Sequence, residues 1–339
     1  MNEFTKKKYF VGVDISKDHL DVALLKAEEL DVFKDKKVDN SFTGFAAIQN
    51  WLLKKRVKLE DCLFCMEHTG TYGILLFAWF SQLGIDYCVE PGMKIKRSSG
   101  ITRGKNDKVD ARRIADYACT NKAKLNPFHM PSGLLLQIKQ FLTYRDQQTK
   151  IKVSLKNSLK SHDQYQRVSG VQSISDEIQH QIAECDQRIE RIDAQIIELI
   201  KADETLKKNF NLASSVKGIG LVIAAFMLVT TNNFTSFENG RKYACYTGIA
   251  PFENTSGKYR GKTRVSHLAN KQVKVLLSNG ANSARKWDPE LRAYYARKID
   301  EGKKHQLVIN SIRCKMVNRV FAVVKRGTPY VNTYQQKIA

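Results

Sequence analysis

The stretch VGVDISKDHLDVALL, residues 11–25, decides the class of fold at the start of the chain. Its first apolar run stops at Asp14 and a second begins at Asp21, which predicts two neighbouring strands. Further strand-like runs follow near 31–38, at CLFCME (62–67) and at IDYCVE (85–90). They alternate with helical patterns at 43–55 and 73–83, so we expect an α/β domain with a mixed sheet.

The charge of the chain is strongly positive and unevenly distributed. The 339 residues include 56 Lys and Arg against 34 Asp and Glu, a formal net charge of +22. Residues 207–339 alone carry 24 basic and 6 acidic side chains. A domain this basic usually binds nucleic acid, although plain solubility is the simpler alternative.

The cysteines and the apolar runs exclude several classes of protein. Cys62 and Cys65 form a C-x-x-C inside an apolar run, and no second pair stands at zinc spacing. An odd number of seven scattered cysteines fits reduced thiols better than a disulfide framework. The first residues lack the apolar core of a signal peptide, and no run is long enough to span a membrane. We therefore expect a soluble cytoplasmic protein.

Residues 134–206 are expected to form a helical arm between two globular parts, 1–133 and 207–339. A seam of apolar residues repeats in this arm at alternating spacings of four and three, which is typical of a coiled coil. The seam consists of Ile178, Ile182, Cys185, Ile189, Ile192, Ile196 and Leu199. An antiparallel or dimeric coiled coil would serve as a spacer or an oligomerisation arm, and the alternative is a long helix packed on its own domain.

The last part combines a glycine turn with a basic loop. Gly218 and Gly220 precede an apolar helix and resemble the turn of a helix-hairpin-helix element, which offers N–H groups to a phosphate. A glycine pair before a helix is also often only a tight turn. Ser256 lies in a polar loop before a helix expected over 268–284. The surrounding cations are expected to contact the DNA backbone, or else to protect a hairpin edge; they are Lys258, Arg260, Lys262 and Arg264.

Four carboxylates form the candidate catalytic set. Asp14 and Glu67 end two strands, and Asp107 and Asp110 lie three residues apart on a helix expected over 107–118. Strand ends converge on one edge of an α/β sheet, where clustered carboxylates need a counter-ion. Mg²⁺ or Mn²⁺ prefers such oxygen ligands and bridges to phosphate. The plainer alternative is that the two helical aspartates form salt bridges with Lys105, Lys108, Arg112 and Arg113.

Four segments, in this order, resemble the insertion-sequence-110 family of DEDD transposases. They are VGVDISKDHLDVALL (11–25), MEHTGTYG (66–73), KNDKVDARRIA (105–115) and GIAPFENTSGKYRGKTRVSHLANKQVK (248–274). The resemblance covers nearly the whole chain. It implies a RuvC-like, RNase H-fold domain, a central coiled coil and a mainly helical transposase domain. It also places the family's metal-binding acids on Asp14, Glu67, Asp107 and Asp110. The run HLANKQVK (267–274) departs from the more basic, glycine-containing run of many relatives.

The resemblance also implies a serine nucleophile, and Ser256 is the matching position. Its hydroxyl would form a phosphoserine link to DNA and release a 3′ hydroxyl. A serine needs a base or a metal to become a good nucleophile, and the ion on the acids would serve. Thr255 is adjacent and remains an alternative. Ser266 matches another recurring position, but it fits better as the N-cap of the helix expected near Leu268.

Partners follow from the same resemblance. The family acts on donor and target DNA and is guided by a structured noncoding RNA, so a bacterial, nucleoid-associated protein is implied. A homo-oligomer, a dimer or tetramer through the coiled coil, would bring the acids of one protomer to the serine domain of another. Arg103 and Lys105 would contact nucleic acid near the metals.

Two other classes remain open from the residues alone. One is a Holliday-junction-resolving endonuclease that uses the same acids with water as the nucleophile, for which Ser256 would be dispensable. The other is a non-enzymatic nucleic-acid-binding protein in which the carboxylates form structural salt bridges.

Overall fold

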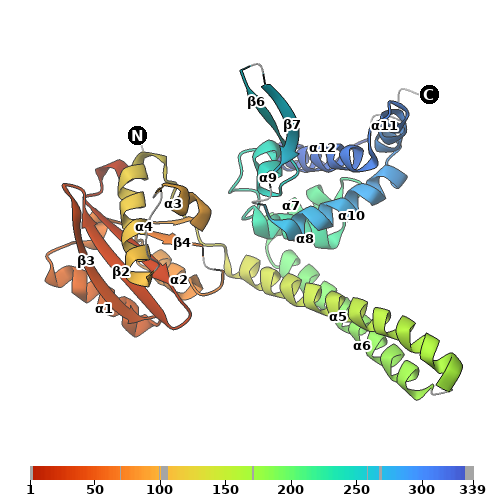
Figure 1. Cartoon of the computed structure of the whole chain (residues 1–339), viewed down its shortest axis with the longest axis horizontal. Helices are drawn as coiled ribbons and strands as arrows, with labels where there is room; N and C mark the ends of the chain where they lie inside the picture. Colours follow the sequence, from red (N-terminus) through yellow and green to blue (C-terminus); the bar gives the residue numbers. More distant parts are fainter. Residues whose placement is uncertain are drawn as a thin grey trace. The chain divides into compact units, whose positions relative to one another are not determined.

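A computed structural model describes residues 3–68, 70–98, 100, 106–169, 172–257, 259–266 and 269–332. The chain divides into two compact units, Met1–Met130 and Pro131–Ala339. Figure 1 labels their helices and strands. In the ranges given above, no helix combines the length and the apolar character needed to cross a membrane.

The first unit is built on a five-stranded mixed sheet. Its strands lie in the order β3-β2-β1-β4-β5, with β1, β2 and β3 antiparallel and β1, β4 and β5 parallel. This is the strand order of the RNase H fold, and the predicted mixed α/β domain is confirmed. The strands are β1 (Tyr9–Ile15), β2 (His19–Lys26), β3 (Glu29–Asp39), β4 (Cys62–Glu67) and β5 (Tyr87–Glu90).

Helices cover both faces of this sheet because alternate strand residues are apolar on both sides. Val11 and Val13 share a core with α1 (Phe42–Lys54) and α2 (Ile74–Gln82) on one face. Phe10, on the opposite side of β1, shares a second core with α3 (Gly92–Ser98) and α4 (Asp107–Asn121). The C-terminal end of β1, with Asp14, therefore emerges on the side of the sheet that α4 covers.

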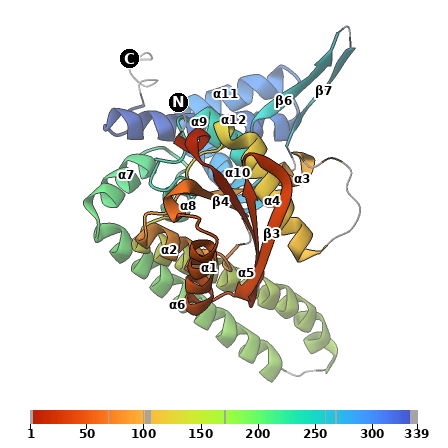
Figure 2. The ribbon, with the colours of Figure 1, turned by 90° about the vertical axis from the view of Figure 1, so that its left-hand side faces the viewer.

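Two long helices open the second unit as an antiparallel hairpin. α5 (Gly133–Ser169) and α6 (Ser173–Lys201) lie side by side (Figures 1 and 2). Arg145 contacts Asp193 and Lys152 contacts Asp186. Later residues of α5 therefore contact earlier residues of α6, as they do in an antiparallel pair. Four residues of the expected seam are buried: Ile178, Cys185, Ile192 and Ile196. The last two pack on α5 of the same chain.

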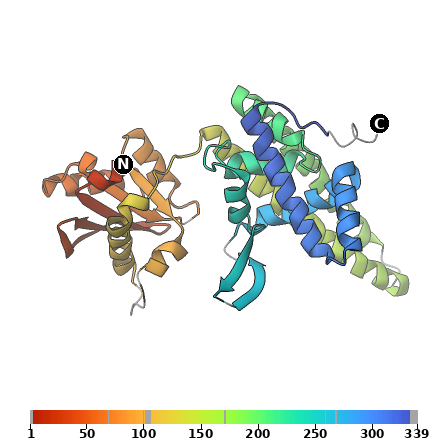
Figure 3. The same ribbon diagram turned by 90° about the horizontal axis from the view of Figure 1, so that it is seen from above.

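The rest of this unit is a helical body with one projecting hairpin. The helices share a core in which α12 contributes a long apolar stripe of Ile309, Ile312, Met316 and Val320. The hairpin of β6 (Pro251–Ser256) and β7 (Tyr259–Val265) projects from this body (teal in Figure 3). The helices are α7 (Glu204–Ser214), α8 (Leu221–Thr230), α9 (Gly240–Tyr246), α10 (Lys271–Trp287), α11 (Pro289–Asp300) and α12 (His305–Arg326).

Two local predictions in this part are wrong. Ser256 was expected in a polar loop, but it is the last residue of β6. Ser266 was expected to cap a helix near Leu268, but α10 begins at Lys271. Asn270 is its N-cap, because its side chain accepts a hydrogen bond from the Val273 N–H at 3.2 Å.

Candidate active site

The four predicted carboxylates lie at one edge of the first unit. Asp14 is the penultimate residue of β1 and Glu67 is the last residue of β4. Asp107 and Asp110 lie in the first turn of α4, which Asn106 caps by accepting a hydrogen bond from the Lys108 N–H at 2.9 Å. Acidic side chains are favourable in the first turn of a helix because the N-terminal end carries partial positive charge.

Close packing at Gly12 places α4 beside the end of β1. A Cβ on Gly12 would lie 3.0 Å from the Cα of Ala115, and closer still to backbone atoms of Ala111 and Ala115. Asp14 is on the same side of β1 as Gly12, because strand residues two apart share a face. The helix start, with Asp107 and Asp110, is thereby brought next to Asp14.

The strand registers reveal a row of acids that is wider than predicted. Asp14 pairs with Asp21 of β2, and Glu67 pairs with Glu90 of β5. In the β1–β4 pairing Val13 lies opposite Met66, so Asp14 and Glu67 follow as the next neighbours. Four adjacent strands therefore each carry a carboxylate at the same edge and on the same face of the sheet, in the order Asp21, Asp14, Glu67, Glu90.

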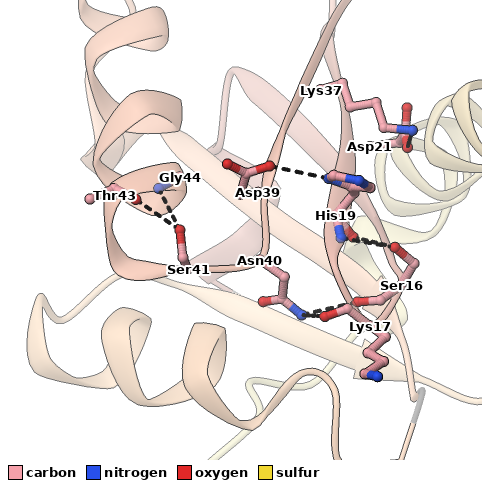
Figure 4. Close-up of polar contacts among 10 residues, drawn as sticks. All are labelled: Ser16, Lys17, His19, Asp21, Lys37, Asp39, Asn40, Ser41, Thr43 and Gly44. Atoms are coloured by element: carbon pink, nitrogen blue, oxygen red, sulfur yellow. Dashed lines mark hydrogen bonds and ion pairs between the residues drawn. The ribbon is translucent and has the colours of Figure 1, made fainter.

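The outer acids of this row have lysine partners. Asp21 lies 3.6 Å from the Nζ of Lys37 on the neighbouring strand (Figure 4), and Glu90 lies 2.7 Å from the Nζ of Lys94. Within the described part of the chain, neither Asp14 nor Glu67 forms a salt bridge. The inner pair therefore carries charge that none of the described basic residues neutralises by direct contact.

The pKa of Asp14 reflects the carboxylates that surround it. Its pKa is raised from 3.8 to about 6, first by burial and then by the charges of Asp107, Asp110, Glu67 and Asp21. A carboxyl group shifted in this way is costly to ionise, and a bound cation would relieve the cost. This shift is the observation that joins the four predicted acids into one cluster.

Salt bridging accounts for only part of the basic segment around Asp107 and Asp110. Asp110 pairs with Arg113 at 2.8 Å. Lys108 and Arg112 instead bind Asp35 of β3, the former at 3.2 Å. Lys105 lies outside the described residues. The plainer alternative therefore holds for Asp110 and Arg113, and among the described residues Asp107 has no salt-bridge partner.

The donor chemistry of the cluster fits a hard divalent cation. The residues supply carboxylate oxygens, which Mg²⁺ and Mn²⁺ prefer, and Asp14 has the raised pKa of a group that lacks a counter-ion. Across the described ranges, no three His, Cys, Asp or Glu side chains already form a set that could hold a metal ion. The two findings differ because charges interact over longer distances than ligand bonds. The carboxylates are near one another, and their side chains would have to close around the ion.

Ser256 lies at the tip of the β6–β7 hairpin. It pairs with Tyr259 across a turn in which Gly257 has a φ of +55°, a conformation that favours glycine. Ser256 and Thr255 are both exposed. No histidine or carboxylate among the described residues is hydrogen-bonded to the Ser256 hydroxyl.

The structure describes only some of the residues that were predicted to contact nucleic acid. Gly218 has a φ of +88°, and its Cα packs so tightly on α10 that a Cβ would lie 2.5 Å from the Gly280 carbonyl oxygen. Gly220 precedes α8 in open space, and no side chain caps this helix. Arg260 is exposed on β7. The side chains of Lys262 and Arg264, and all of Arg103, Lys105 and Lys258, lie outside the description.

Sequence reasoning missed three residues of this edge. Glu90 ends IDYCVE just as Glu67 ends CLFCME, so a signal for it was present in the pattern. Asp21 was treated only as the start of a strand. Gly92 gave no signal, yet its Cα lies against the Glu67 carboxylate.

Comparison with known proteins finds two matching family models. A transposase model for DEDD transposases of the IS110 type matches residues 11–164. A second, described as "Transposase IS116/IS110/IS902 family", matches residues 211–296. The first range contains the four acids and the second contains Ser256.

Two of the relatives span most of the chain at low identity, and others match a part of it. The pilin gene-inverting protein of Moraxella bovis is 23% identical, covering 95% of this chain and 98% of that protein. An insertion element IS116 protein of Streptomyces clavuligerus is 20% identical over 94% and 95%. An insertion element IS110 protein of Streptomyces coelicolor is 31% identical over 34% and 29%. A structure of T. thermophilus RuvC with a Holliday junction substrate is 13% identical, covering 35% of this chain and 99% of that chain with a TM-score of 0.27.

Proposed function

Because the chain belongs to the IS110 family of transposases, we propose that it cuts and rejoins DNA strands through a serine-linked intermediate with help from the acid cluster. The observation that carries the proposal is the convergence of the acids at one sheet edge, where Asp14 and Glu67 are neighbours in the β1–β4 pairing and α4 packs on Gly12. The raised pKa of Asp14 agrees with this arrangement. The pilin gene-inverting relative supports rejoining, because inversion of a gene requires that every broken end be joined again.

In this proposal Asp14, Glu67, Asp107 and Asp110 hold Mg²⁺ or Mn²⁺. When bound, the ion would supply positive charge to phosphate oxygens and to the attacking oxygen. The chain's own part is to keep the four carboxylates together against their mutual repulsion. Gly12 contributes because it has no side chain, so that α4 can pack directly on β1 and bring Asp107 and Asp110 close to Asp14.

Ser256 is the proposed nucleophile. Its Oγ would attack a backbone phosphorus, the bond to the 3′ oxygen would break, and the proton from Oγ would pass to the departing 3′ hydroxyl. The phosphoserine ester keeps the bond energy, so that a new 3′ hydroxyl can displace Ser256 and restore it. Exposure at a hairpin tip suits a residue that must reach a DNA backbone.

We propose that the acids and the serine act together across protomers. The acids belong to the unit Met1–Met130 and Ser256 belongs to Pro131–Ala339. The α5–α6 hairpin, proposed as the coiled coil, would serve as the dimer or tetramer contact that pairs the two sites.

Three features are proposed to recognise the DNA: basic side chains, a glycine turn and a guide RNA. The basic residues Arg260, Lys262 and Arg264, with Lys258, Arg103 and Lys105, would bind phosphates and make binding depend on salt. The turn at Gly218 and Gly220, read as a helix-hairpin-helix element, would add backbone N–H groups. A structured noncoding guide RNA would choose the sequences by base pairing.

A covalent-trapping experiment tests the mechanism. The protein, Mg²⁺, its cognate guide RNA and end-labelled donor and target DNA are incubated, denatured and examined for a protein–DNA adduct. We expect an adduct with the wild-type protein and with Thr255→Val, and none with Ser256→Ala or Asp14→Ala.

The same experiment distinguishes the serine mechanism from the alternative function, a water-using endonuclease. Cleavage without an adduct that persists in Ser256→Ala would replace the serine mechanism with a water-using endonuclease on the same acids. An adduct lost in Thr255→Val and kept in Ser256→Ala would move the nucleophile by one residue. An adduct at full yield in Asp14→Ala would remove the acid cluster from the reaction.

A further inference from the structure

The Glu67 carboxylate rests directly on the first residue of α3. A Cβ on Gly92 would lie 2.7 Å from Oε2 of Glu67, and closer still to Oε1 and Cδ. Every other amino acid at position 92 would therefore displace this carboxylate. Its position is set by the backbone of α3 as well as by the end of β4.

An ion pair between a buried glutamate and an exposed lysine holds the corner from which α3 starts. Glu90, the last residue of β5, is 8% exposed, and its Oε2 lies 2.7 Å from Lys94 Nζ on the first turn of α3. Between them the Pro91 carbonyl accepts a hydrogen bond from the Lys94 N–H at 2.8 Å. Ile95 anchors the same helix in the core against α4. The Glu90–Lys94 pair thus holds Gly92 where Glu67 needs it.

Glu90 also differs from the proposed ligands in its surroundings. Glu90 lies in the same row as Glu67, on the neighbouring strand, but it already forms a salt bridge with Lys94. The His68 N–H donates to the Glu90 carbonyl at 3.0 Å, which continues the β4–β5 pairing beyond Glu67. A carboxylate that already has a lysine partner is better placed to support a neighbour than to bind a second cation itself.

We propose that Gly92, Glu90 and Lys94 are positioning residues that orient the Glu67 carboxylate toward the divalent ion. The inference rests on the proposed function, because it assumes that Glu67 binds the ion. In this role the three residues act on the Glu67 carboxylate and the start of α3, and not on the ion itself. Partners of this kind tune metal affinity by fixing the ligand before the ion arrives.

Gly92→Ala separates positioning from folding. The atoms that the new methyl group meets are the tip of a flexible side chain, so the protein can fold while Glu67 turns aside. Lys94→Met removes the ammonium and keeps the aliphatic stem, and Lys94→Arg restores a cation. Lys96→Met, an exposed lysine of the same helix, and Gly133→Ala, a glycine with open space around its Cα, are the matched controls.

The experiment is a calorimetric titration of the full-length protein with Mn²⁺ alone, beside thermal unfolding of each variant without metal. We expect Gly92→Ala and Lys94→Met to bind Mn²⁺ roughly tenfold more weakly, the size typical of supporting residues at metal sites. Lys94→Arg should recover part of the affinity, and both controls should bind as the wild type does. The melting temperature of Gly92→Ala should stay within about 2 °C of the wild type, because only a flexible side chain has to move.

The outcomes distinguish the two proposals. Wild-type binding that Asp14→Asn abolishes and that Gly92→Ala and Lys94→Met leave unchanged would overturn the positioning role and keep the metal site. Equal loss of affinity in Lys96→Met would mean that the loss does not depend on the pair with Glu90, which would overturn the positioning role of Lys94. Absence of Mn²⁺ binding by the wild type would remove the metal site, and the positioning role with it.

Discussion

The backbone of Ala111 in α4 occupies the space that a side chain on Gly12 of β1 would need. This contact lets a helix lie directly on a strand, and it sets the distance between Asp14 and the start of α4. The obstructing atoms are backbone atoms of a regular helix, so they cannot move aside without displacing α4 itself.

Gly12→Ala should therefore destabilise the protein by about 3 kcal/mol, as overpacking against rigid backbone does. Urea unfolding with the wild type and Gly133→Ala measures the effect. Gly133 has open space at its Cα and no left-handed φ, so its alanine variant should stay within about 0.5 kcal/mol of the wild type. A Gly12→Ala protein as stable as this control would show that α4 does not press on β1.

Asp14→Asn should stabilise the metal-free protein at neutral and alkaline pH. The folded-state pKa of about 6 lies above the ordinary 3.8, so ionisation is disfavoured in the fold. The resulting loss of stability is absent below pH 4, grows as the pH rises, and is complete above pH 6. Because the side chain is partly exposed, we expect the variant to gain about 1–2 kcal/mol at pH 8 and nothing at pH 4.

Urea unfolding of both proteins at the two pH values, in the presence of EDTA, checks this prediction. Asp35→Asn is the matched control, because Arg112 and Lys108 lower the pKa of Asp35 and its loss should destabilise the fold at pH 8. An Asp14→Asn protein less stable than the wild type at pH 8 would mean that the acids do not repel one another.

The α5–α6 hairpin should owe part of its register to Arg145 and Asp193. The guanidinium donates twice to the carboxylate, from Nε at 2.6 Å and from Nη2 at 3.0 Å, and both side chains are largely buried. A double-mutant cycle with alanine should give a coupling of about 1 kcal/mol. The exposed pair of Lys150 and Asp146 on α5 should give less than about 0.5 kcal/mol. Equal couplings would assign the register to the apolar seam alone.

The edge of the sheet shows what the sequence could and could not predict. Asp14 and Glu67 were visible because an apolar run stops at each of them, which is a local property of a strand. Their alignment with Asp21 and Glu90 depends on the register between strands, which is set by connections and packing far along the chain. The roles of Gly12 and Gly92 depend on where α4 and α3 come to lie, and no short stretch of sequence encodes that.

Competition between similar local signals explains the misplaced helix start. Ser266 and Asn270 both have side chains that can cap a helix. Pairing of Val265 with Pro251 keeps the chain extended up to the residue before Ser266, so the helix starts later and Asn270 becomes the cap. The tertiary pairing of a hairpin thus decided between two equally good capping residues.

Arg319→Met should be among the more damaging single changes in the second unit. Arg319 Nη1 lies 2.9 Å from Oδ2 of Asp288, a carboxylate with no exposed surface that also caps α11 by accepting from the Leu291 N–H at 3.0 Å. Removing the guanidinium leaves this charge buried without a cation, at a cost of about 3 kcal/mol. Asp288→Asn in the same protein keeps the cap and removes the charge, so the double variant should regain more than half of the loss. Urea unfolding of the wild type and the two variants measures this, and a double variant less stable than Arg319→Met would mean that the guanidinium acts through Glu290 or Tyr330 instead.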